Sequence, residues 1–115
     1  MKINHENALK LWTERYGNNL HVYDFTNRQM FRGAYGDQNS KFGWNIHHKQ
    51  PIGNGGSNDK LNLEITSIFV NKEIGDRTSF VIDDIQYQVK RIMRPEYGIF
   101  IIENGDSTER VDYNE

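Results

Sequence analysis

The chain contains no cysteine, which excludes disulfide bonds and zinc sites built from thiolates. Its longest apolar run is only a few residues, too short to cross a bilayer. No apolar stretch follows the first charged residues, so we expect no signal peptide. From these absences we expect a soluble, cytoplasmic protein with no membrane partner.

Neither sign of charge dominates, since 14 Lys and Arg stand against 16 Asp and Glu. Nucleic-acid-binding domains are usually basic, so the formal net charge of −2 by itself argues against that partner. The acids gather at the end, because residues 103–115 hold five acids and one base. The remaining 102 residues hold 13 bases and 11 acids. A mildly basic body with an acidic tail is compatible with a DNA site elsewhere.

The length and apolar content predict one folded domain over residues 1–115. Twelve isoleucines and fourteen aromatic residues favour strands over a helical bundle. An amphipathic pattern nevertheless predicts a helix over 4–16, capped by Asn4 and ended by Gly17. A shorter helix is expected over 67–74, with Ser67 as its cap. The fold class is therefore α+β.

Alternating and β-branched segments predict strands along the rest of the chain. The segments are 20–25, 30–32, 44–48, 62–66, 79–83, 86–92 and 98–103. Asp83-Asp84 is expected to turn a hairpin within a C-terminal antiparallel meander. Residues 51–59 form a loop rich in Gly, Asn and Ser, and residues 104–115 are expected to fray as an acidic tail.

The most informative segment runs Trp44-Asn45-Ile46-His47-His48-Lys49-Gln50-Pro51, followed by Gly55-Gly56, Asn62-Leu63 and Asn71. Two adjacent imidazoles can divide two tasks between them. One can bind a metal ion while the other activates a water molecule. Hydrolysis of a phosphodiester with a single divalent ion requires this division.

Residues 42–76 resemble the HNH endonuclease family, in particular small bacterial and phage members, whose site is the ββα-metal fold. The resemblance implies that His47 and Asn71 bind the metal and that His48 is the general base. It implies that Asn62 orders the loop between the strands and helps orient that base. The expected architecture is an HNH-like hairpin and helix, preceded by an N-terminal helix and followed by the β meander.

Neighbouring residues of a regular strand point to opposite faces, so His47 and His48 can share a site only if the strand bends near Pro51. Neither implied ligand carries a charge, whereas Mg²⁺ prefers anionic oxygen. The expected cofactor is Mg²⁺ or Mn²⁺, with Ni²⁺ and Zn²⁺ as further candidates because of the imidazole. Asp37, Glu73 or Asp76 could supply the missing negative charge.

Five cations surround the motif in the sequence, and they are Lys41, Lys49, Lys60, Lys72 and Arg77. They can be interpreted as a rim that contacts DNA phosphates. They can equally be solvated surface charges, and the sequence does not decide between the two interpretations.

The sequence thus predicts a metal-dependent DNA endonuclease that hydrolyses phosphodiesters by a one-metal HNH mechanism. The alternative is a catalytically weak or inactive binding protein on an HNH scaffold, from a phage or mobile element. Such a protein could inhibit a host nuclease, as an anti-CRISPR factor does, and its acidic tail could imitate DNA. The alternative predicts a protein partner in place of DNA.

Overall fold

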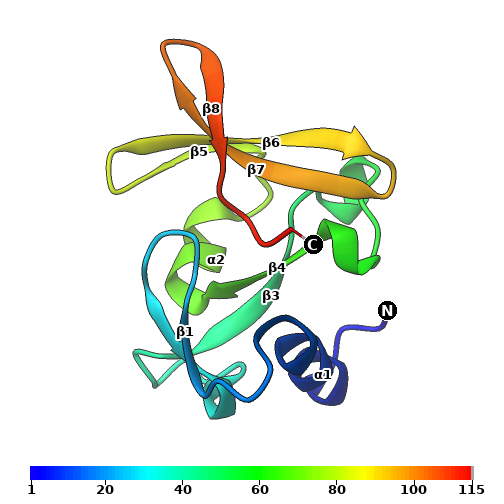
Figure 1. The fold of residues 1–115 in the computed structure, drawn as a ribbon, viewed down its shortest axis with the longest axis vertical. Helices are drawn as coiled ribbons and strands as arrows, with labels where there is room; N and C mark the ends of the chain where they lie inside the picture. The colour runs from blue at the N-terminus through cyan, green and yellow to red at the C-terminus, as the bar shows by residue number, and fades with distance from the viewer. Residues whose placement is uncertain (115) are drawn as a thin grey trace.

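A computed structural model describes residues 1–114, which form a mixed α+β structure with antiparallel sheets (Figure 1). The helices are α1 (His5–Tyr16) and α2 (Ile68–Ile74). Two hairpins follow α1, first β1 (His21–Tyr23) with β2 (Gln29–Phe31), then β3 (Trp44–His48) with β4 (Leu63–Ser67). A four-stranded sheet contains β5 (Ser79–Ile82), β6 (Ile85–Met93), β7 (Glu96–Glu103) and β8 (Asp106–Arg110). The predicted α+β class is confirmed.

The N-terminal helix α1 forms as its pattern predicts. Asn4 accepts a hydrogen bond from the backbone N–H of Asn7, and the chain leaves the helix at Gly17 with a φ of 60°. The buried face of α1 includes Trp12, whose ring centroid lies 4.8 Å from that of Trp44. This contact fixes the helix against the β3–β4 hairpin.

The β3–β4 hairpin lies at the centre of the molecule (Figure 1). Strand β3 begins at Trp44 and ends at His48, as predicted. The strands pair antiparallel, with His47 opposite Glu64 and His48 opposite Leu63. The side chains of the hairpin that pack into the α1 core are apolar, and they are Trp44, Ile46, Leu63 and Ile65. Strand β4 starts one residue later than predicted, because Asn62 ends the 3₁₀ turn Lys60–Asn62.

Helix α2 connects this hairpin to the C-terminal sheet. The Ser67 hydroxyl accepts a hydrogen bond from the N–H of Val70 and caps the helix, as predicted. Val70 and Ile74 are fully buried and pack on a second core with Phe80, Tyr87 and Ile99 of the sheet. This packing fixes one face of α2 against the C-terminal sheet. Within residues 1–114, no helix has the length and apolar character to span a bilayer.

The prediction that residues 104–115 fray is wrong for the part of the chain that the structure describes. Asn104 and Gly105 have φ angles of 53° and 84°, which is the geometry of a tight hairpin turn. The following residues form β8, which pairs antiparallel with β7 and projects from the body with it (Figure 1). The error arose because β8 is largely exposed, so its polar sequence lacks the apolar alternation of a half-buried strand.

The first predicted strand, 20–25, is also shorter in the structure. Asp24 leaves β1 because its carboxylate accepts hydrogen bonds from the backbone of Thr26 and Arg28 in the turn. It also accepts one from the N–H of Ser67, at the start of α2. The buried carboxylate therefore ties the first hairpin to the second.

Candidate metal and catalytic site

A pocket of about 540 Å³ lies where the β3–β4 hairpin meets α2. His47 and His48 of β3 and Asn71 of α2 line it, together with the loop residues 51–54 and Asp76. Three of the four residues predicted to perform chemistry therefore share one cavity. The fourth, Asn62, lies behind it.

Asn62 holds the chain just after β3, beyond both histidines. Its side-chain oxygen accepts from the N–H of Gln50 at 2.8 Å, and its amide nitrogen donates to Gln50 O at 3.0 Å. The same nitrogen donates to Ser57 O at 2.9 Å, and the side chain is fully buried. The Asn62 amide thus satisfies both backbone polar groups of Gln50, as a neighbouring strand would, and holds the chain in place after β3 has ended. The predicted loop-ordering contacts are present, and they do not include the His48 side chain.

Gly56 explains the glycine pair of the motif. A Cβ atom built on Gly56 would lie 1.8 Å from Gln50 O and 2.9 Å from Asn62 Nδ2. Only glycine lets the loop cross so close to the bend. The Gly-rich segment thus serves the same bend as Asn62.

The side chains of His47 and Asn71 contact each other in the lining of the pocket. His47 Nδ1 lies 2.9 Å from Asn71 Oδ1, and His47 is 6% exposed. Because an amide oxygen only accepts, Nδ1 donates in this contact, and the buried Nε2 has no hydrogen-bond partner among the described residues. Burial lowers the pKa of His47 below 6.5, partly offset by the hydrogen bond to Asn71. The ring is therefore neutral at pH 7, the state that binds metals.

His48 is held by a residue that the sequence reasoning missed. His48 Nε2 lies 2.6 Å from Asn58 Oδ1 in the loop. The amide oxygen accepts from Nε2–H, which leaves the lone pair of a neutral ring on Nδ1. Asn58 was missed because nothing in its spacing separates it from the other polar loop residues. The imidazole thus has a fixed tautomer, suited to accepting a proton.

Of the three acids that could supply negative charge, Asp76 alone lines the pocket in the part of the chain described. It follows Gly75, which ends α2 with a φ of 56°. Its charge favours protonation of His47, so the two groups interact. Among residues 1–114, however, no three His, Asp or Glu side chains converge as a ready metal cluster. The pocket offers an imidazole nitrogen, an amide oxygen and a nearby carboxylate.

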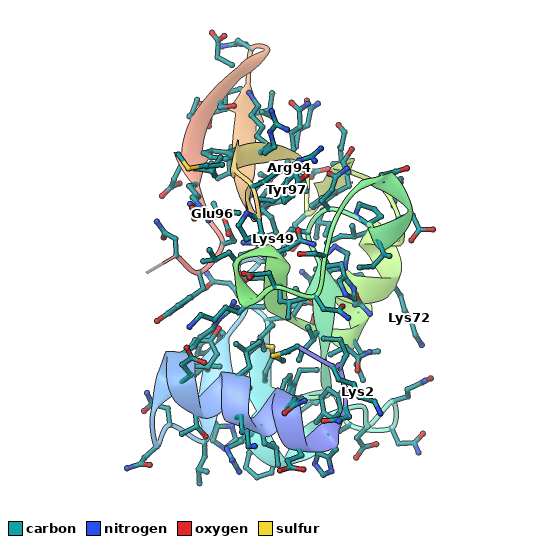
Figure 2. All side chains as sticks on the ribbon, turned by 90° about the vertical axis from the view of Figure 1, so that its right-hand side faces the viewer. Lys2, Lys49, Lys72, Arg94, Glu96 and Tyr97 are labelled. Carbon is teal, nitrogen blue, oxygen red and sulfur yellow. The ribbon has the colours of Figure 1, made fainter. Side chains whose placement is uncertain are left out.

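The five predicted phosphate contacts do not form one rim. Lys49 is 1% exposed and donates to Asp112 Oδ2 at 2.7 Å, so its assignment to a DNA-contacting surface is wrong (Figure 2). Sequence proximity misled here, because the residue next to His48 points into the interior between the hairpin and the C-terminal sheet. Lys60 is exposed and pairs with Glu14 of α1.

The other three cations lie on or near α2. Lys72 projects from α2 into solvent, and together with Lys41 it lines a second depression (Figure 2). Arg77 folds back and donates to the carbonyls of Glu73 and Ile74 at the end of the helix. Lys41 and Lys72 are therefore the two predicted cations that share a concave surface.

Comparisons with known proteins return no match to a protein-family model, a curated protein or a solved structure.

Proposed function

We propose that the protein is a metal-dependent DNA endonuclease that hydrolyses phosphodiester bonds with one divalent ion, in the manner of HNH enzymes. One observation carries the proposal. Two adjacent histidines of β3 line a single pocket with Asn71 of α2, and the contact with Asn58 leaves Nδ1 of a neutral His48 ring able to accept a proton. The ββα arrangement of β3, β4 and α2 agrees with the fold that the sequence resemblance implies.

An imidazole nitrogen beside an amide oxygen suits a borderline divalent ion such as Ni²⁺ better than Mg²⁺. Two neighbouring ligands of an octahedral ion at ~2.1 Å are separated by about 3.0 Å. His47 Nδ1 and Asn71 Oδ1 are 2.9 Å apart, so they can ligate one ion without moving apart. The His47 ring would then carry its proton on Nε2, the opposite of the tautomer that donates to Asn71, so the ion would replace the hydrogen bond between the two side chains. His47 and Asn71 would hold the ion, and Asp76, which lines the same pocket, would add negative charge beside it.

When bound, the cation supplies charge that stabilises the phosphate and the leaving oxygen. His48 Nδ1 takes a proton from the attacking water, while Asn58 holds the other nitrogen. The water oxygen forms a bond to phosphorus, and the bond to the 3′-oxygen breaks. Protonation of that oxygen gives a 3′-hydroxyl, and the other product carries a 5′-phosphate. Asn62 holds the chain at Gln50, directly after the strand that carries both imidazoles.

Plasmid cleavage tests the proposal. Purified protein with Mg²⁺, Mn²⁺ or Ni²⁺ is expected to nick or cut supercoiled plasmid, and EDTA is expected to stop the reaction. His48→Ala should lower the rate by about 100- to 10,000-fold, the usual contribution of a positioned base. His21→Ala is the matched control, since His21 lies on β1 outside the pocket. Equal cleavage by the parent and His48→Ala would refute the role of His48.

A second candidate is a protein that binds a nuclease in place of DNA. It is favoured by the β7–β8 hairpin, which projects from the body and exposes Glu103, Asp106 and Glu109 (Figure 1). Asp112, which the sequence counted among the acids of the tail, is buried and does not contribute to this surface, and Glu115 lies outside the described residues. This candidate predicts no cleavage with any metal and a stable complex with a nuclease.

A further inference from the structure

The second depression lies beside the first and is bounded by the same helix. It has a volume of about 590 Å³ and is lined by residues of the β2 region, the 38–43 loop and the start of α2. Lys72 of α2 faces this groove, whereas its neighbour Asn71 lines the metal pocket. The two cavities are therefore lined by consecutive residues of α2.

The groove has the charge of a phosphate-binding surface. Arg28, Lys41 and Lys72 line it, and no Asp or Glu does so among the described residues. Arg28 also pairs with the exposed Asp83 at 3.0 Å, so the two lysines carry most of the excess charge. The whole chain is slightly acidic, which makes this local excess of positive charge a specific feature.

The groove also presents an aromatic surface. Phe69 is 49% exposed although it lies on a helix whose other large apolar residues are buried. The guanidinium of Arg28 lies over its ring, 4.4 Å from the centroid. Aromatic rings and arginine planes are the surfaces on which unpaired bases stack, and stacking tolerates any base. In a duplex the bases are already stacked and cannot use such a surface.

We infer that this groove, defined by Arg28, Lys41, Phe69 and Lys72, binds a single-stranded segment of the nucleic acid that leaves the metal pocket. The inference rests on the proposed function for the direction of the strand. The two lysines contact phosphates, and Phe69 with Arg28 stacks a base.

Fluorescence anisotropy with a labelled oligothymidylate in EDTA tests the inference, because without metal the strand stays uncut. The double variant K41Q/K72Q should weaken binding at least tenfold and reduce the slope of log affinity against log salt by about 1.4. Phe69→Ala should weaken binding about tenfold and leave the salt slope unchanged. Lys90→Gln and Tyr23→Ala, exposed residues outside the groove, serve as controls and should bind as the parent does. Melting temperatures check that each variant is folded.

The outcomes separate this inference from the proposed function. Groove variants that bind like the parent overturn the inference, as does a parent that does not bind the oligonucleotide, even if plasmid cleavage is robust. The inference is also overturned if a duplex binds as tightly as the single strand and Phe69→Ala does not change the affinity. The parent could also bind the oligonucleotide through the groove and yet fail to cleave plasmid with every metal tested. That result would support the groove and refute the proposed nuclease function.

Discussion

His48 Nε2 lies 2.6 Å from the side-chain oxygen of Asn58, and this contact sets which nitrogen of the base is free. Asn58→Ala should lower kcat about tenfold and leave KM unchanged, because the imidazole loses its orientation while substrate binding stays intact. Asn58→Asp should restore much of the rate, since a carboxylate also accepts from Nε2–H. The control is Asn18→Ala, in the exposed turn after α1. A raised KM with unchanged kcat would show that Asn58 binds substrate and does not position the base.

The buried pair of Lys49 and Asp112 fixes the C-terminal segment to the β3–β4 hairpin. Asp112 accepts from Lys49, from Arg110 and from the backbone of Ile99. These partners outweigh burial and hold the pKa of Asp112 below 3.8. Asp112→Ala leaves a buried ammonium without its carboxylate, and should cost about 3–5 kcal/mol in the free energy of unfolding.

Chemical denaturation measures the effect of Asp112→Ala. The double variant Lys49→Met with Asp112→Leu should recover most of the loss, because it removes both charges together. Lys60→Gln, at an exposed pair, should change stability by less than about 1 kcal/mol. A loss for Asp112→Ala no larger than that for Lys60→Gln would contradict the assigned role of the buried pair.

Glu64 gives the fold an unusual pH dependence. Burial raises its pKa from 4.5 to about 7, and Arg15 and the N–H of Tyr113 offset only part of that penalty. The folded state therefore binds a proton more readily than the unfolded state between pH 4.5 and 7. The contribution of Glu64 to stability falls as pH rises through this window, by about 2–3 kcal/mol.

Thermal melts of the parent and Glu64→Gln between pH 5 and 7 measure this contribution. His47 acts in the opposite sense, since burial lowers its pKa and acid then favours the unfolded state. Glu64→Gln should therefore lose stability more steeply on acidification than the parent does. Parallel curves for the two proteins would contradict the raised pKa of Glu64.

Gly56 can be tested against a neighbouring glycine. A Cβ at Gly56 collides with Gln50 O, whereas a Cβ at Gly53 has no neighbour within 4 Å. Gly56→Ala should lower stability by about 1–3 kcal/mol and reduce cleavage, because the bend after β3 must shift. Gly53→Ala should leave the melting temperature unchanged. Equal melting temperatures for both variants would indicate that the loop accommodates the methyl group.

The sequence predicted the local structure around the site well, because this structure depends on short-range signals. The strand over 44–48 and the caps at Asn4 and Ser67 follow from pattern and capping chemistry. The partnership of His47 with Asn71 came from the family resemblance, and the structure brings the two side chains into contact.

Long-range relationships could not be read from the sequence. Lys49 meets Asp112 63 residues away, and no local pattern distinguishes this buried lysine from exposed Lys72. Strand β8 is polar because its hairpin projects into solvent, so composition alone suggested a frayed end. Asn58 acts through the shape of a loop that is set by Asn62 and Gly56, and loop shape has no periodic signature.

The central claim is that one divalent ion is held between His47 and Asn71. The most direct test is to measure the melting temperature with and without Mn²⁺. An ion that binds only the folded state should raise the melting temperature of the parent by several degrees at saturating concentration. The account predicts that His47→Ala and Asn71→Ala each abolish this rise, while His21→Ala retains it. A rise of the same size in all four proteins, or none in the parent with Mg²⁺, Mn²⁺ or Ni²⁺, would contradict the account.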